Sequence, residues 1–234
     1  TRDAIRDGLT KITVRAGWRN TEMHTVFQGS VFSAVSERSG ADIVTRISAL
    51  PGYGALQRGV SSRTFPQGTP VRDVVADLAR DLPNLTVAGS GIEGVEGVIN
   101  SGGWSFAGST REALTQLATE YGFSWHVDDG SFRALGDTAA FGRFVELSGD
   151  GGGLISVTPS LSGPAQLRRG VKIKAVYIPG LAPGGRVGVK SAVSPTLDGT
   201  YRVHTMRIST ESHAEAWLMA VETWGRGCLR RSEQ

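Results

Sequence analysis

The sequence predicts a mainly β fold in which two antiparallel β-strand regions flank an α+β insert with a duplicated strand–helix–strand pattern. Three observations support this prediction. Glycine accounts for 32 of the 234 residues, roughly twice its usual share, which indicates many turns and strand ends. Alternation of apolar and polar residues, the period of a half-buried strand, dominates both ends of the chain. Between the two ends, apolar positions recur at helical spacing.

Composition excludes several classes of protein. Hydrophobic residues make up 39% and charged residues 20% of the chain, as in globular proteins. The net charge is +3, and the Lys and Arg residues are scattered, which does not favour a nucleic-acid groove. Cys228 is the single cysteine, so no internal disulfide is expected and a reducing compartment is favoured. No apolar run reaches the ~18 residues of a membrane span, so no membrane partner is expected.

The first fifty residues predict a meander of three strands. These are residues 9–16, a strand over residues 26–32 that bulges or bends at Gly29, and residues 42–47. The Pro- and Gly-containing residues 51–54 then interrupt the pattern. We interpret residues 1–57 as a β-strand meander that forms one domain. No signal peptide is recognised. Because the chain opens at Thr1 rather than Met, we expect it to be a piece of a longer protein.

Helical spacing begins after residue 70. Apolar residues over 71–82 predict a helix with Thr69 as its N-cap and Pro70 as its first residue, followed by a strand over residues 85–88. A second helix is predicted from Glu112 to Tyr121, after a strand at residues 104–106 and before a stop at Gly122. Residues 123–127 and 131–135 then form a hairpin around Asp129-Gly130.

The two predicted helices match each other at a constant offset. Leu78 aligns with Leu117, and the charged residues around them align as well. We therefore interpret residues 58–137 as a duplicated strand–helix–strand insert, in which Leu78 and Leu117 occupy equivalent buried positions. The alternative is that two amphipathic helices of similar length resemble each other by chance.

The last ninety residues return to the strand period. Strands are predicted at residues 144–147, 154–157, 171–178, 186–190 and 201–208, with a slip in the alternation at Thr205 and a compact loop at residues 179–185. Residues 215–223 fit a helix or a strand, and we choose a strand because Trp217, Met219 and Val221 then share one face. Residues 138–226 are predicted to form a β-barrel domain, and residues 227–234 a tail.

One motif resembles a cofactor site. A literal GxGxxG occurs at Gly89-Ser90-Gly91-Ile92-Glu93-Gly94, directly after a predicted strand. A dinucleotide site requires this turn to open a helix. The residues that follow, up to Gly103, are too rich in glycine for that helix, so we interpret the motif as a flexible connecting loop.

The remaining chemical patterns are incomplete. His213-Ala214-Glu215 has the HxE spacing of zinc deaminases, but the partner Pro-Cys-x-x-Cys is absent. The other residues weighed are the histidines His24, His126 and His204, the turn carboxylates Asp128, Asp129 and Asp150, and the tryptophans Trp18, Trp104, Trp125, Trp217 and Trp224. We interpret the tryptophans as core or interface, with sugar or peptide binding as the alternative. No catalytic, cofactor-binding or metal residue is predicted, and no cofactor.

Four segments carry a family resemblance. They read ELSGDGGGLISVTPSLSGPAQLRRGVKIKAVYIPGLAPGGRVGVKS, LDGTYRVHTMRISTESHAEAWLMAVET, VFQGSVFSAVSERSGADIVTRISA and FPQGTPVRDVVADLA. The first two resemble the C-terminal half of phage tail baseplate hub proteins, the late control protein D-like tail tip hubs of contractile-tailed phages. The third resembles a strand pair of the same family, and the fourth fits its middle domain. The loop at residues 192–197 is an extension.

The resemblance implies a structural protein of the virion tail baseplate, assembled in the host cytoplasm, and not an enzyme. It implies a homotrimeric ring in which two tube-like antiparallel β-barrels per subunit, formed by residues 1–57 and 138–226, mimic sixfold symmetry. The implied partners are the tail tube protein, the central spike protein and, further, the tape measure protein, with DNA only in passage. We expect a neutral or mildly acidic channel wall. The alternative function is a cell-wall or carbohydrate-binding module of a tail-associated hydrolase.

Overall fold

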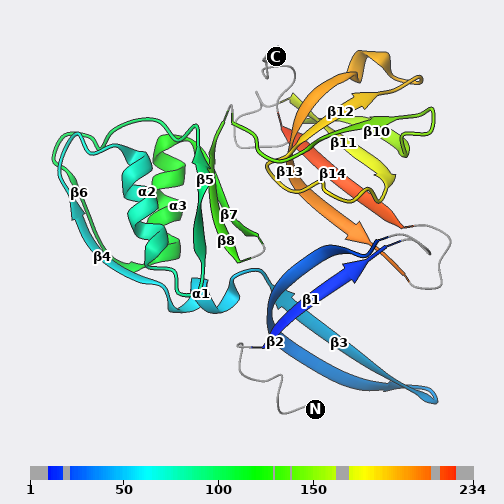
Figure 1. The fold of residues 1–234 in the computed structure, drawn as a ribbon, viewed down its shortest axis with the longest axis horizontal. Coiled ribbons are helices and arrows are strands. Elements are labelled where there is room, and N and C mark those ends of the chain that lie inside the picture. Colours follow the sequence, from blue (N-terminus) through cyan, green and yellow to red (C-terminus); the bar gives the residue numbers. More distant parts are fainter. Residues whose placement is uncertain are drawn as a thin grey trace. The chain divides into compact units, whose positions relative to one another are not determined.

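The computed structural model describes residues 10–17, 22–128, 130–137, 139–161, 169–211 and 217–224. The chain divides into two compact units, Thr1–Asp137 and Thr138–Gln234 (Figure 1). The fold is mainly β with an α+β segment, which confirms the predicted class. Within the described residues, no helix has the length and apolar character needed to cross a membrane.

The first unit begins with the predicted antiparallel meander. Its strands are β1 (Lys11–Ala16), β2 (His24–Ser39) and β3 (Asp42–Leu50), paired in the order β1-β2-β3. The predicted strand does contain bulges, but they do not lie at Gly29, which pairs in register with Ile12. The register shifts lie at Val26, opposite β1, and at Phe32, opposite β3. Glycine is needed at position 29 for another reason, since a Cβ there would lie 2.8 Å from the Leu50 carbonyl.

The rest of the first unit is a layered α+β fold. Its elements are α1 (Tyr53–Arg58), β4 (Val60–Phe65), α2 (Val71–Arg80), β5 (Thr86–Glu93), β6 (Trp104–Ser109), α3 (Thr110–Tyr121), β7 (Phe123–Asp128) and β8 (Ser131–Gly136). Strands β4 and β6 pair as a two-stranded ribbon, and β5, β8 and β7 form a second sheet. Helices α2 and α3 lie between these two sheets (Figure 1). The short helix α1 was not predicted.

The helix predictions are confirmed with small corrections. Leu78 and Leu117 are both 0% exposed and belong to one core between the layers. Gly122 ends α3 in the left-handed conformation, with φ of 69°. The N-cap of α2 is Pro70 rather than Thr69. The Thr69 hydroxyl instead donates to the Pro66 carbonyl, at 2.8 Å. The order strand–helix–strand occurs twice, as β4–α2–β5 and β6–α3–β7.

The second unit is a curved six-stranded sheet. Its strands are β9 (Phe144–Ser148), β10 (Leu154–Leu161), β11 (Arg169–Val176), β12 (Arg186–Lys190), β13 (Gly199–Ser209) and β14 (Leu218–Trp224), in the order β10-β11-β14-β13-β12-β9. Strand rather than helix is therefore confirmed for β14. The prediction of a purely antiparallel barrel is wrong, because β9 and β12 run parallel. A parallel pair requires a long crossover, and here β10 and β11 lie within that crossover.

The second unit has its own core. The inward residues of the sheet and of the loop after β11 are Val145, Leu147, Val171, Ile173, Ala175, Leu181, Val187, Val189, Tyr201, Val203, Met219 and Val221. The slip predicted near Thr205 is present as a register shift at His204, between β13 and β14. A short 3-10 helix, Pro195–Leu197, lies in the predicted loop extension.

Candidate functional site

The glycine-rich motif forms a strand rather than a loop. Strand β5 continues to Glu93, and the next regular element is the strand β6, so no helix opens after the motif. The prediction of a flexible loop over the whole motif is therefore wrong. A Cβ on Gly136 at the end of β8 would overlap the backbone carbonyl of Gly94. This close approach of two backbones explains the glycine at position 136, and Gly94 has a positive φ of 63°.

The structure does not gather the histidines and carboxylates weighed from the sequence. His24, His126 and His204 lie on β2, β7 and β13, and Asp128 ends β7 while Asp150 lies in a turn after β9. His213-Ala214-Glu215, Cys228 and Asp129 lie outside the described residues. In the described part of the chain, no group of three or more His, Cys, Asp or Glu side chains is arranged to hold a metal ion.

The tryptophans with described side chains pack against aromatic rings of their own unit. The Trp104 ring is stacked on Phe106, with centroids 5.6 Å apart and planes at 5°. Trp125 is stacked on Phe132 at 6.0 Å. The Trp217 indole nitrogen donates to the Glu211 carbonyl at 2.9 Å. These contacts agree with the core interpretation. Trp18 and the side chain of Trp224 lie outside the described part.

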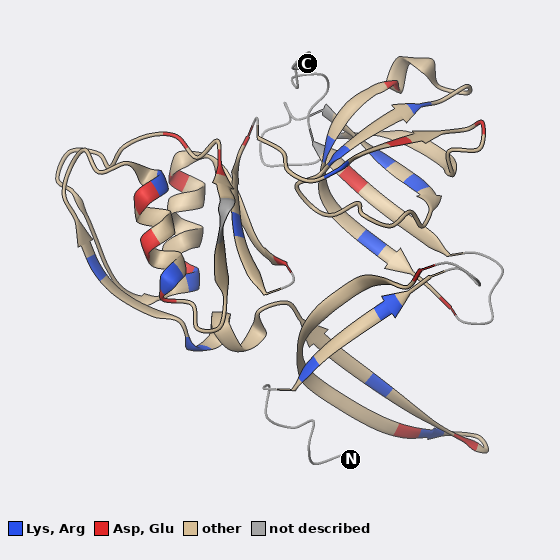
Figure 2. Cartoon of the chain, in the orientation of Figure 1, with Lys and Arg blue, Asp and Glu red and all other residues tan. Residues whose placement is uncertain are grey.

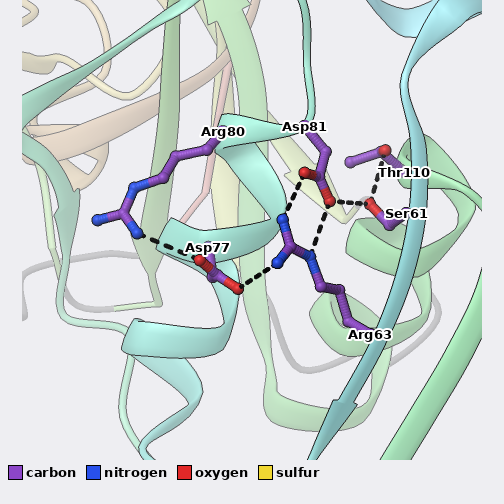
Figure 3. Close-up of polar contacts among 6 residues, drawn as sticks. All are labelled: Ser61, Arg63, Asp77, Arg80, Asp81 and Thr110. Atoms are coloured by element: carbon purple, nitrogen blue, oxygen red, sulfur yellow. Dashed lines mark hydrogen bonds and ion pairs between the residues drawn. The ribbon is translucent and has the colours of Figure 1, made fainter.

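A polar cluster joins β4 to helices α2 and α3 (Figure 3). The Arg63 guanidinium makes a bidentate contact with Asp81, with Nη2 2.7 Å from Oδ1 and Nε 3.2 Å from Oδ2. The Nη1 atom of Arg63 lies 3.5 Å from the carboxylate of Asp77 on α2, the helix whose C-cap is Asp81. Two parallel N–H···O bonds to a carboxylate fix geometry as well as charge.

Two buried hydroxyls complete the cluster. Ser61 is 1% and Thr110 0% exposed. The Ser61 hydroxyl donates to Asp81 Oδ2 at 2.8 Å and lies 2.8 Å from the Thr110 hydroxyl, at the start of α3. The hydrogen bond from Arg63 lowers the pKa of the Asp81 carboxyl. The cluster therefore holds β4, the end of α2 and the start of α3 together. Sequence reasoning missed it because its members stand far apart in the chain.

Replacing Asp81 by Asn should destabilise the protein at neutral pH and less at acid pH. The folded-state pKa of Asp81 is lowered, so its stabilising contribution is present above the unfolded value of about 3.9 and is lost as the pH falls below it. The difference in urea midpoint between wild type and D81N should therefore shrink from neutral pH to about pH 3. Ser61→Ala should cost roughly 1–3 kcal/mol. A constant D81N difference across this range would contradict the assignment.

The end of the β2–β3 hairpin is an exposed arm. We define the β2–β3 arm as residues 33–39 and 42–48. Four apolar side chains of the arm are largely exposed: Val35 at 52%, Ile43 at 76%, Val44 at 41% and Ile47 at 44%. Directly opposite residues of paired strands share a face. Ile47 pairs with Ala34, and Ile43 with Arg38, on one face, whereas Val35 pairs with Arg46, and Val44 with Glu37, on the other.

The arm therefore presents apolar side chains on both faces. A two-stranded hairpin alone is marginally stable in water. Exposed apolar strand surface marks an interaction site or an aggregation liability. An exposed ion pair between Arg46 and Glu37, at 2.8 Å, adds little stability. The arm is thus the described part of the first unit that most needs a partner surface.

Comparison with known proteins identifies relatives of the whole fold. The sequence profile of the family described as Baseplate hub gp41 matches residues 3–223. No curated protein sequence matches significantly. Among solved structures, the tail protein from Neisseria meningitidis MC58 has a TM-score of 0.63 at 12% identity, covering 86% of this chain and 80% of that one. The 43 kDa tail protein of prophage MuSo2 from Shewanella oneidensis has a TM-score of 0.62 at 10% identity, covering 91% and 87%.

A third similar structure comes from a secretion machine. The E. coli c3393 protein has a TM-score of 0.59 at 11% identity, covering 88% of this chain and 62% of that one. It is described as a component of the type VI secretion system with structural similarity to the T4 bacteriophage tail proteins gp27 and gp5. At these identities the solved structures show a shared fold. The family profile spans nearly the whole chain, and on that ground the protein belongs to the baseplate hub gp41 family of structural phage-tail proteins.

Proposed function

We propose that three copies of this chain form the hub ring of a phage tail baseplate, which joins the tail tube to the central spike and encloses the DNA channel. Family membership supports a place in the tail baseplate. The number three comes from the resemblance of the sequence to trimeric hubs. The observation that carries self-assembly is the β2–β3 arm, whose two apolar faces are exposed on the single chain.

The open sheet edges give the ring a way to close. In the described residues, β1 and β3 are the edges of the first sheet, and β10 and β9 are the edges of the six-stranded sheet. An unpaired edge offers free N–H and C=O groups to a neighbouring chain. A head-to-tail contact between two different surfaces closes into a ring when its rotation fits a whole number of copies. The arm and an edge of a second copy would supply those two surfaces.

The mass in solution tests the ring. Light scattering at micromolar concentration and low salt should give about three times the 24.8 kDa of one chain, and electron microscopy should show rings. The purified ring should also bind tail tube protein and central spike protein through its two open ends. A stable single chain, with no ring and no affinity for tube protein, would overturn the proposal.

One feature favours the alternative function in cell-wall binding. A groove in the first unit is lined by Tyr53, Arg111 and Trp125, among other residues, and aromatic rings with a polar neighbour suit a sugar face. A protein that stays a single chain and co-sediments with purified cell wall, and that loses this binding in Tyr53→Ala, would support a wall-binding module instead of a hub.

A further inference from the structure

The outer face of four strands in the second unit is polar and sparsely cationic. Along β11 and β14 the buried residues alternate with exposed ones, as a sheet with one solvated face requires. We define the cationic face as the outward residues Ser156 and Thr158 on β10, Lys172 and Lys174 on β11, Ala220 and Glu222 on β14, and Thr205 and Arg207 on β13. The half-buried Leu218 lies beside them in the same groove. Figure 2 shows the basic positions on these strands.

The cations of this face are only partly neutralised. Lys172 Nζ lies 3.0 Å from the Glu222 carboxylate. No described residue forms an ion pair with Lys174 or Arg207. These two residues lie in one row across the sheet, on either side of Ala220. Because neighbouring strands are about 4.8 Å apart, their backbones are separated by roughly 10 Å. The alanine between them leaves the row open to a ligand.

The composition of the face does not suit a protein partner. The centres of protein interfaces are enriched in aromatic residues, Met and Arg, and depleted of Lys, Ser, Ala and Glu. Among the eight members of the cationic face, Arg207 alone is of an enriched type, and the others are Lys, Ser, Thr, Ala and Glu. Hydroxyl groups and cations are instead the groups that contact the phosphates and sugars of nucleic acids.

We propose that the cationic face contacts the sugar–phosphate backbone of duplex DNA, an inference that rests on the proposed hub and assigns part of its channel wall. It departs from the neutral or mildly acidic wall expected from the sequence. The two unpaired cations of each subunit neutralise few phosphates, so the contact is weak and strongly salt-dependent. Weak contacts without base recognition leave the duplex free to slide.

The test uses the full chain and a fluorescein-labelled DNA duplex. Fluorescence anisotropy at low salt should show binding that weakens steeply with salt. The double variant K174Q/R207Q should bind at least about tenfold more weakly, with a salt slope reduced by roughly 0.9 for each lost cation. The matched control is R58Q/R72Q, which removes two exposed cations from α1 and α2 and should bind within about twofold of wild type.

Three outcomes would overturn this inference. They are no DNA binding at low salt, equal losses in the two double variants, or stronger binding of polyglutamate than of DNA, which would point to an acidic protein partner. Light scattering on the same samples separates this result from the hub proposal. A trimer that does not bind DNA contradicts the cationic face alone, whereas a single chain that binds DNA through Lys174 and Arg207 contradicts the ring alone.

Discussion

Exchanging Ile43 and Ile47 for Thr should convert the proposed trimer into single chains. Both side chains lie on one face of the β2–β3 arm, at 76% and 44% exposure. Burial of an isoleucine against a partner contributes roughly 1.5–3 kcal/mol. Loss of both from each contact should weaken it by about a hundredfold or more, since 1.4 kcal/mol corresponds to a factor of ten. Threonine keeps the branched side chain that strands favour, so the chain itself should fold.

Light scattering and circular dichroism check this result together. The expected result is a threefold fall in mass with an unchanged strand signal. Val60→Thr is the matched control, because Val60 is a β-branched residue on a strand of the same unit and is 69% exposed. It should leave the trimer intact. A variant I43T/I47T that still forms trimers as tightly as wild type would show that this face of the arm is not a subunit contact.

Leu78→Ala and Leu117→Ala should each lower the free energy of unfolding by roughly 2–5 kcal/mol. Both side chains are 0% exposed and pack in the core between the two sheets of the first unit. Truncation to Ala removes apolar contacts and leaves a cavity that a close-packed core fills only in part. Because the two positions are equally buried on adjacent helices, we expect similar costs.

Thermal and urea unfolding measure these costs. Val60→Ala removes a comparable volume from an exposed position and should change stability by about 0.5 kcal/mol or less. The midpoints should therefore fall clearly for the two leucine variants only. Unchanged unfolding in both leucine variants would remove the argument for a duplicated insert, because equivalent buried helix positions are its main structural consequence.

Local patterns in the sequence predicted most of the regular elements. The helical spacing of Val74, Leu78 and Ala79 identified α2, and the alternation after Gly199 identified β13, because burial of one face imposes those periods on the sequence. The family resemblance, carried by strand and turn residues at both ends of the chain, supplied the function class. Residue types at the turns were also informative. The glycine at position 122 predicted the end of the second helix, and Gly122 ends α3 in the left-handed conformation.

Contacts between distant segments could not be predicted. The parallel pairing of β9 with β12 depends on residues about forty positions apart, and nothing in either strand encodes the direction of its partner. The cluster of Arg63, Asp81 and Ser61 could not be predicted for the same reason. These three polar residues come into contact only when β4 packs on α2. Strand β5 was underestimated because glycine lowers the strand signal even where a close backbone requires it.

The position of β14 in its sheet has a consequence for how the second unit folds during translation. β14 is the last described strand of the chain, yet it pairs with β11 on one side and β13 on the other. During translation, β10 with β11 and β9 with β12 and β13 would remain two separate pieces, each with exposed apolar residues, until residues 218–224 leave the ribosome. Long-range pairing of this kind is slow and exposes the chain to aggregation. A chain truncated before β14 would lack one of the two central strands of the six-stranded sheet and could not enter the proposed ring.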